Sequence, residues 1–192
     1  RLAFEELFFF AIGLKLLRSR RETVDVVPFR NVDMAPFYRS LPFTLTDAQR
    51  RCVEEAIGDM CSGKPMNRLW QGDVGSGKTM VAAACVYFCV KNGRQAALMV
   101  PTELLAEQHY RGLAPLLEKL NIRCALLTSS TPAKTKRSVT AQLASGEIDF
   151  AIGTHALISD SVAYADLGLV VTDEQHRFGV EQRTALAEKG SH

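Results

Sequence analysis

The stretch from Gly72 to Thr79, Gly-Asp-Val-Gly-Ser-Gly-Lys-Thr, has the residue types and spacing that bind phosphate. It matches the pattern G-x-x-x-x-G-K-[ST] at every fixed position. Glycines permit backbone angles that a side chain would forbid, so successive N–H groups can turn toward phosphate oxygens. Lys78 is expected to reach the β- and γ-phosphates, and the Thr79 hydroxyl to ligate Mg²⁺. The predicted ATP-binding residues are Gly72, Asp73, Val74, Gly75, Ser76, Gly77, Lys78 and Thr79.

The segments on either side of this stretch fit a strand, a loop and a helix in series. Leu69 and Trp70 lead in as a short predicted strand, and the apolar residues from Met80 to Val90 lead out as a helix. This is the context that the phosphate-binding pattern requires. The flanks therefore favour a phosphate loop over the alternative, a glycine-rich turn before a core helix.

Two adjacent carboxylates, Asp173 and Glu174, follow the apolar segment from Leu167 to Thr172. We assign Asp173 to Mg²⁺, directly or through water, and Glu174 to the water that attacks the γ-phosphate. The alternative is a pair of acids at a solvated strand end. Because a complete phosphate loop lies upstream, the expected catalytic set is Lys78, Asp173 and Glu174.

The order of the predicted elements indicates an α/β fold. Besides the short segment 69–70, strands are expected at residues 95–100, 123–128, 148–153 and 167–172. Helices are expected at 46–61, 80–90, 102–120, 131–144 and 179–189. Strands separated by helices need crossover connections, which give a mainly parallel sheet covered on both faces. The sequence therefore predicts a three-layer P-loop domain.

The first 40 residues differ in character from the rest. Residues 1–21 have a broad apolar face and are expected to form an N-terminal helix, too short and too interrupted by charge to span a bilayer. Residues 22–42 lack periodicity and contain three prolines, which predicts an extended connector. We therefore place a domain boundary near residue 40, with the α/β domain at 41–192.

Several polar residues directly follow predicted strands. In parallel sheets, ligands lie beyond the carboxyl ends of the strands. The phosphate loop, Thr102, Thr128, Thr154 and Asp173 should therefore line one edge. Threonine hydroxyls can grip phosphates without reading bases, and helix capping is a compatible alternative. The basic cluster at residues 134–137 is interpreted as a solvated face, with a DNA contact as the alternative.

Longer runs around these residues resemble the motifs of superfamily 2 helicases. The run Asp173-Glu174-Gln175-His176, continuing to Arg183, looks like motif II and is similar to RecG-type DNA helicases. The phosphate loop resembles motif I of that family, residues 101–110 resemble motif Ia, and residues 153–157 resemble motif Ib. Gln49, in Leu45-Thr46-Asp47-Ala48-Gln49, is placed like the glutamine that reads adenine. The resemblance covers about residues 41–190.

The resemblance implies an ATP- and Mg²⁺-dependent DNA helicase that remodels branched DNA, such as stalled forks, in repair. It implies nucleic-acid contacts at Thr102, Thr128, Thr154 and His155, and coupling through His176. Residues 1–40 are similar to the segment that joins a DNA-binding wedge domain to the motor. A second RecA-like lobe, which supplies a catalytic arginine in this family, is not part of the sequence. The chain alone is therefore expected to bind nucleotide and hydrolyse it poorly.

Three other functions compete with this interpretation. The transcription–repair coupling factor resembles the same segments, but that family typically carries Glu where Gln175 stands and a bulky residue where Ser76 stands. A small P-loop kinase would need arginines placed for an acceptor lid, which the sequence lacks. A nucleotide-gated binding module would keep the loop but not Glu174. For Gln49, completing a capping box with Thr46 remains an alternative to the adenine role, and the two are compatible.

Composition sets few limits on partners. The net charge of +2 is too small to indicate a partner class. Five cysteines form no C-x-x-C pair, which suits reduced thiols in a cytosolic protein. Cys85 and Cys89, one helical turn apart, are expected to pack in the core rather than bind a metal. We expect no signal peptide or membrane span, and a bacterial-type cytoplasmic, nucleoid-associated location.

Overall fold

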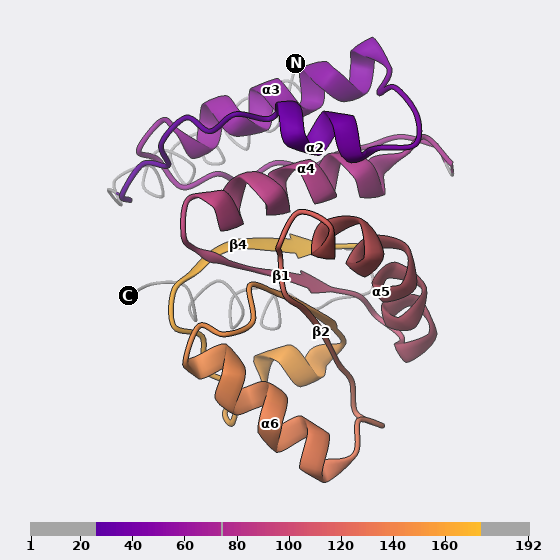
Figure 1. The fold of residues 1–192 in the computed structure, drawn as a ribbon, viewed down its shortest axis with the longest axis vertical. Helices are drawn as coiled ribbons and strands as arrows, with labels where there is room; N and C mark the ends of the chain where they lie inside the picture. The colour runs from indigo at the N-terminus through magenta and orange to yellow at the C-terminus, as the bar shows by residue number, and fades with distance from the viewer. Residues whose placement is uncertain (1–25, 74, 174–192) are drawn as a thin grey trace, which may run out of the picture.

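Four parallel strands form the sheet in the computed structural model, which describes residues 26–73 and 75–173. They are β1 (Gln95–Met99), β2 (Cys124–Leu127), β3 (Phe150–Gly153) and β4 (Leu167–Thr172), in the order β2-β3-β1-β4 (Figure 1). All three strand pairings are parallel, as predicted. The predicted helices at 1–21 and 179–189 lie outside the described residues.

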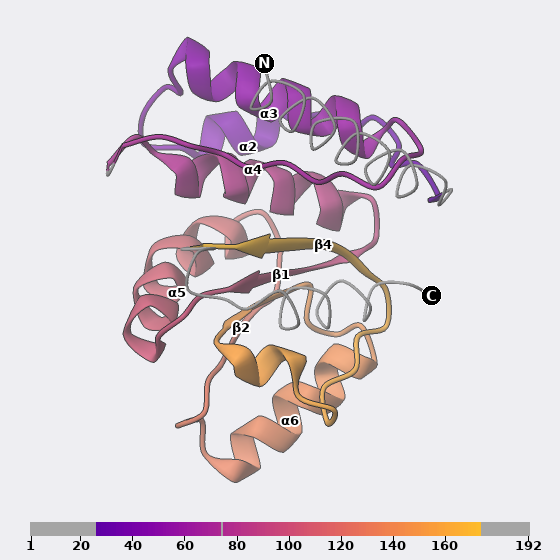
Figure 2. The ribbon, with the colours of Figure 1, turned by 180° about the vertical axis from the view of Figure 1, so that it is seen from behind.

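Helices cover both faces of this sheet, which confirms the three-layer α/β prediction. One side carries α4 (Lys78–Lys91) and α5 (Glu103–Glu118), with α3 (Asp47–Met60) and the short α2 (Ala35–Ser40) packed outside α4 (Figure 2). The other side carries α6 (Ala133–Ala144) and the 3₁₀ helix η1 (His155–Ile158). The sheet is therefore buried between two helical layers in the described part of the chain.

Alternation along the strands explains the two cores. In β1, Ala96 and Leu98 face the core with α4 and α5, whereas Ala97 and Met99 face the core with α6 and η1. All five residues of β1 are buried, so this strand has no polar face. Burial on both sides is what the continuous apolar run in the sequence indicates. β1 is thus one of the two inner strands, with β3, on which both layers pack.

One buried polar side chain, Gln95 at the start of β1, ties three segments together. Its Nε2 donates to the carbonyls of Leu143 (2.9 Å) and Ile148 (2.7 Å), at the end of α6 and ahead of β3. Its Oε1 accepts from the backbone N–H groups of Ala165 (2.7 Å) and Asp166 (3.0 Å), just before β4. With every amide hydrogen-bonding position used, Gln95 sets where β4 enters the sheet.

The described part of the connector packs on the α/β domain. Residues 22–42 were expected to be extended, but Ala35–Ser40 form α2, with Pro36 in its first turn where a missing N–H costs nothing. Phe37 is fully buried in the core with α3 and α4. Phe29 stacks under Arg94, whose guanidinium lies 5.1 Å from the ring centroid. Burial of these side chains therefore holds the connector against the α/β domain. The sequence did not predict this packing, because the connector has no apolar periodicity.

The predicted strand at Leu69 and Trp70 is absent from the structure. Arg68 instead pairs with Glu55 (2.6 Å) and Asp59 on α3, and Leu69 is 68% exposed. These two ion pairs hold the segment before the phosphate loop along α3. Leu69 and Trp70 indicated a strand because both are apolar, but the ion pairs of the preceding Arg68 with α3 were not visible in the sequence.

The expected starts of α3 and α5 are confirmed, whereas α6 begins differently from the expectation. Thr46 and Gln49 form a complete capping box at α3, and the Thr102 hydroxyl accepts from Leu105 N (3.3 Å) at α5. The helix expected from residue 131 has Pro132 as its N-cap residue, and the Thr131 hydroxyl accepts from Thr128 N (2.9 Å). Thr131 therefore closes the turn after β2 and does not cap the helix.

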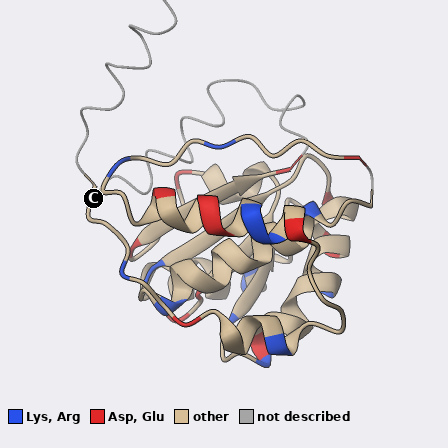
Figure 3. Ribbon diagram, turned by 90° about the horizontal axis from the view of Figure 1, so that it is seen from above, with Lys and Arg blue, Asp and Glu red and all other residues tan. Residues whose placement is uncertain are grey.

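Charged residues of both signs are interspersed on the helices seen in Figure 3, and neither sign forms a separate patch in that view. Among the described residues, no helix is long and apolar enough to cross a membrane.

Replacing Gln95 by Leu should destabilise the fold strongly. The change removes four hydrogen bonds and leaves the Ile148 carbonyl and the Asp166 N–H without this partner, so we expect the free energy of unfolding to fall by about 3 kcal/mol or more. Urea denaturation followed by circular dichroism measures this. The exposed Gln108 on α5 provides the control, because Gln108→Ala should change stability by less than about 0.5 kcal/mol. Equal stability of Gln95→Leu and the unmodified chain would contradict the assigned role.

Candidate functional site

The phosphate loop lies at the carboxyl edge of the sheet. Helix α4 begins at Lys78 and ends at Lys91, and the short turn at residues 92–94 reverses the chain into β1. The start of α4 is therefore at the same edge as the end of β1. Because β4 is parallel to β1, Asp173 also lies at that edge, where its N–H donates to Met99 O (3.0 Å). The predicted loop and the predicted metal ligand are thus brought to one side of the domain.

The glycines of the loop have the backbone angles expected of them. Gly75 and Gly77 have φ values of 83° and 78°, in the left-handed region. A Cβ at Gly72 would lie 2.7 Å from Ser76 Oγ, so the two ends of the loop approach each other closely and a side chain there would displace the Ser76 hydroxyl. Among the described residues no side chain caps the first turn of α4. These features fit a cradle of N–H groups for an anion at a helix N-terminus.

Lys78 folds back over the loop. Its ammonium group donates to the carbonyl oxygens of Gly72 and Asp73, the latter at 3.0 Å. The lysine therefore holds the loop through neutral acceptors, in an arrangement that differs from the predicted contact with phosphate. Hydrogen bonds between ions are stronger than those to carbonyls, so β- and γ-phosphates can replace these acceptors. Thr79 follows in the first turn of α4, as a metal ligand from this motif requires.

Gln49 connects α3 to the loop as well as capping α3. Its Oε1 accepts from Thr46 N (2.9 Å), and its Nε2 donates to Ser76 O (2.8 Å). A Cβ at Gly77 would lie 2.3 Å from Nε2, so this amide packs directly on the loop. The capping alternative is therefore confirmed, and the adenine role stays a prediction. The contact with Ser76 spans 27 residues and could not be inferred from spacing.

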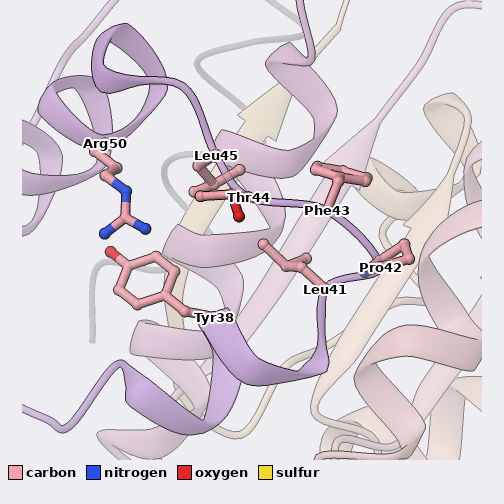
Figure 4. Close-up of a pocket in the computed structure, with 7 residues that line it drawn as sticks. All are labelled: Tyr38, Leu41, Pro42, Phe43, Thr44, Leu45 and Arg50. Carbon is pink, nitrogen blue, oxygen red and sulfur yellow. The ribbon is translucent and has the colours of Figure 1, made fainter.

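A pocket of about 250 Å³ adjoins Gln49, lined by residues 41–45 with Tyr38 and Arg50 (Figure 4). The Arg50 guanidinium lies 5.4 Å from the centroid of the Tyr38 ring. Phe43 is 50% exposed, which is unusual for a large aromatic side chain. Sequence reasoning missed these residues, although the apolar run Leu41-Pro42-Phe43 just before a polar cap was a usable signal.

Asp173 forms a hydrogen bond with a residue from another motif-like segment. Its Oδ2 lies 3.0 Å from His109 Nε2 on α5, and the two side chains are 38% and 14% exposed. An ionised carboxylate only accepts, so the imidazole N–H is the donor. The predicted catalytic partner Glu174 and the predicted coupling residue His176 lie outside the described residues, as does Val74. Their roles therefore stay predictions.

The threonines predicted to hold nucleic acid do gather at this edge, but two are buried. Thr128 and Thr154 are 4% and 2% exposed. The Thr128 hydroxyl bonds to those of Ser130 and Thr131, whereas the Thr154 hydroxyl has no partner in the described structure. Thr102 serves as the cap of α5. Thr102 and His155 are exposed, and the His155 side chain contacts Ser129 Oγ at 3.3 Å.

Glu103 also belongs to this edge, although the sequence did not single it out. Its carboxylate accepts from Ser130 N at 2.9 Å, joining the start of α5 to the turn after β2. Hydrogen bonds from Ser130, a weaker one from Ser129 and the proximity of His155 lower the pKa of Glu103 below its usual value. The turn at Ser129 and Ser130 therefore stabilises a negatively charged oxygen.

The cysteines behave as core residues. Cys85 and Cys89 are fully buried on α4. Burial raises the pKa of the Cys85 thiol to about 12 and raises that of Cys89 as well. In the part of the chain that the structure covers, no three His, Cys, Asp or Glu side chains cluster as a metal site would need. Oxygen ligands from Thr79 and Asp173, completed by phosphate, are consistent with Mg²⁺, which uses few protein ligands.

Comparison with known proteins gives consistent matches. The family model described as DEAD/DEAH box helicase matches residues 46–191. The ATP-dependent DNA helicase RecG of Bacillus subtilis is 50% identical over 99% of this chain, and that of Streptococcus pneumoniae is 51% identical over the same share. The chain spans 28% of the length of each of these relatives.

A solved structure of RecG bound to a three-way DNA junction superposes with a TM-score of 0.85 and 47% identity. The match covers 93% of this chain and 25% of that one. The RecA-like fold predicted from the motifs is thereby confirmed.

Two substitutions separate the cap from the loop contact. Gln49→Glu keeps the acceptor for Thr46 N but loses the donor to Ser76 O and adds a negative charge beside the phosphate site. We expect nearly unchanged stability and nucleotide affinity reduced roughly tenfold, the equivalent of one hydrogen bond. Thr46→Ala should show the reverse, with about 1 kcal/mol of stability lost and affinity retained.

Urea unfolding and titration with a fluorescent ATP analogue in Mg²⁺ measure both quantities. If Gln49→Glu binds the analogue as tightly as the unmodified chain, the loop contact has no role in nucleotide binding.

Proposed function

Because the chain belongs to the DEAD/DEAH box helicase family, we propose that it is the first RecA-like lobe of an ATP-dependent DNA helicase of the RecG type. The whole protein would remodel branched DNA, such as stalled forks and recombination intermediates. The observation that carries the proposal is the meeting of a complete phosphate loop with Asp173 at one sheet edge, beside exposed groups suited to a nucleic-acid backbone. Residues 1–40 would connect this lobe to a DNA-binding wedge domain.

The proposed chemistry is hydrolysis of the γ-phosphate. Lys78 binds the β- and γ-phosphates after releasing the carbonyls of Gly72 and Asp73. Thr79 and Asp173 would hold Mg²⁺, which would supply positive charge beside the phosphate oxygens. Glu174 orients the attacking water and accepts its proton. Each of these groups belongs to a motif in the sequence, and the location of Lys78, Thr79 and Asp173 at one edge of the sheet is what supports the proposal.

The base of ATP would lie against the pocket before α3. Phe43 offers an exposed aromatic face for stacking, and Arg50 provides a cation at the opposite wall. Gln49 reaches from this region to Ser76 O, so an adenine contact and the phosphate loop share one amide. Because that amide already has two partners, reading adenine requires Gln49 to exchange one of them.

The nucleic-acid backbone would contact the edge beyond β2 and β3. Ser129 and His155 are exposed there, and backbone N–H groups of the turn can bind phosphate oxygens. Thr102, Thr128 and Thr154 would act mainly by holding the helix start and the loops in place. Such contacts are independent of base sequence, which suits a motor that moves along DNA.

A second RecA-like lobe would complete the site by adding an arginine to the γ-phosphate. We propose a cytoplasmic, nucleoid-associated location, since DNA is the proposed substrate and the similar helicases are bacterial. One alternative is a translocase resembling the transcription–repair coupling factor. Another, a nucleotide-gated binding module, is favoured for the isolated chain by the contacts that hold Lys78 on its own loop.

ATP turnover tests the proposal directly. The chain and a version extended through a second lobe should both bind the nucleotide, but turnover should be at least about 10³-fold faster in the extended protein, because the arginine is then supplied. Branched DNA should stimulate the extended protein, and Glu174→Gln should abolish turnover without preventing binding. Full-rate hydrolysis by the chain alone, insensitive to DNA, would exclude the helicase assignment.

A further inference from the structure

The side chain of His109 contacts the predicted metal ligand Asp173 directly. It projects from α5 and places Nε2 3.0 Å from Asp173 Oδ2, across 64 residues of sequence. The imidazole is 14% exposed, so surrounding atoms restrict its orientation. Partners of this kind, one step removed from a metal, fix the direction of the carboxylate lone pairs. His109 therefore restricts the orientation of the Asp173 carboxylate through Oδ2.

The same helix contacts the nucleic-acid edge at its first turn. Glu103 accepts from Ser130 N, and the Thr102 hydroxyl caps the helix beside it. His109 is six positions after Glu103, which is about 9 Å along a helix axis. A single rigid segment thus contacts both the proposed DNA track and the proposed metal site.

Packing makes this segment suitable for transmitting a displacement. Ala106 lies between the two contacts and is fully buried, and Leu113 and Leu117 anchor the following turns. A helix fixed in this way moves as a unit, since close-packed interiors do not deform locally without cost. A change at Ser130 that pulls Glu103 therefore alters the position of His109.

We propose that α5 couples DNA binding to ATP hydrolysis through His109, which acts as a positioning residue for Asp173. The proposal rests on the function proposed above and adds a route that lies within the described residues. DNA phosphate and the Glu103 carboxylate compete for the turn at Ser129 and Ser130. Release of Glu103 shifts α5, and His109 carries the shift to Asp173 and so to Mg²⁺.

Three variants test the positioning role in the 192-residue chain. His109→Leu removes the donor, and we expect the Mg²⁺ concentration for half-maximal binding of a fluorescent ATP analogue to rise about tenfold or more. His109→Gln places a donor near the position of Nε2 and should bring the Mg²⁺ concentration for half-maximal binding most of the way back to that of the unmodified chain. Gln108→Ala, on the exposed side of the same helix, should leave the Mg²⁺ dependence unchanged. Urea unfolding of each variant identifies any loss of folding.

Coupling is then measured in the version extended through a second lobe. Branched DNA should stimulate the ATPase of the unmodified protein and of Gln108→Ala to the same degree, whereas His109→Leu should lose most of that stimulation. His109→Gln should recover it. A merely structural residue would lower basal turnover and stability but keep the ratio of stimulated to basal rates.

The outcomes separate the two proposals. If the unmodified chain binds the analogue without any dependence on Mg²⁺, the ATP site proposed above is wrong and the role of His109 falls with it. If binding depends on Mg²⁺ but His109→Leu matches the unmodified protein in Mg²⁺ dependence and DNA stimulation, the positioning role alone is wrong.

Discussion

Parallel pairing of the strands is the constraint on which the site depends. When every strand runs in the same direction, every strand ends at the same edge, and the connection after each strand begins there. The turn after β2, the 3₁₀ helix after β3, the start of α5 after β1 and Asp173 after β4 are brought together for this reason alone. The phosphate loop joins them because α4 runs back against β1. Residues up to about 100 positions apart in sequence thus share one surface.

Gln95 makes that arrangement specific at the opposite edge. A parallel sheet can admit its edge strand in more than one register, and β4 shows a register shift where it pairs with the start of β1. Four hydrogen bonds from one buried amide fix the chain just before β4 relative to α6 and β3. Gly168, at the shift, leaves space that the side chains of Arg94 and Phe29 fill. The position of Asp173 at the far end of β4 therefore depends on contacts made before the strand begins.

At the carboxyl edge of the sheet, charged and polar groups of the protein form hydrogen bonds with one another. Lys78 binds carbonyls of its own loop, Glu103 binds the turn at Ser130, and His109 binds Asp173. The first two contacts use donors that a phosphate would otherwise engage, the ammonium group of Lys78 and the N–H of Ser130, whereas His109 orients the carboxylate of Asp173. Replacing one hydrogen-bond partner by another costs less free energy than ordering and desolvating free polar groups, because these groups are already oriented and partly removed from water. The edge is therefore held in order while remaining able to bind anions.

The sequence alone determined the fold class, the phosphate loop, the capping box at Thr46 and four of the five predicted strands, because these features depend on residues close together in the chain. Spacing of Gly, Lys and Thr and runs of apolar residues carry that local information. The tertiary structure decided the rest. Arg68 forms ion pairs with residues of α3, and Leu69 beside it is not part of the sheet. Gln49 donates a hydrogen bond to Ser76 O in the phosphate loop. His109 met Asp173 through the packing of α5 on the sheet. No local pattern encodes such pairings, because they arise only when burial and strand order bring distant segments together.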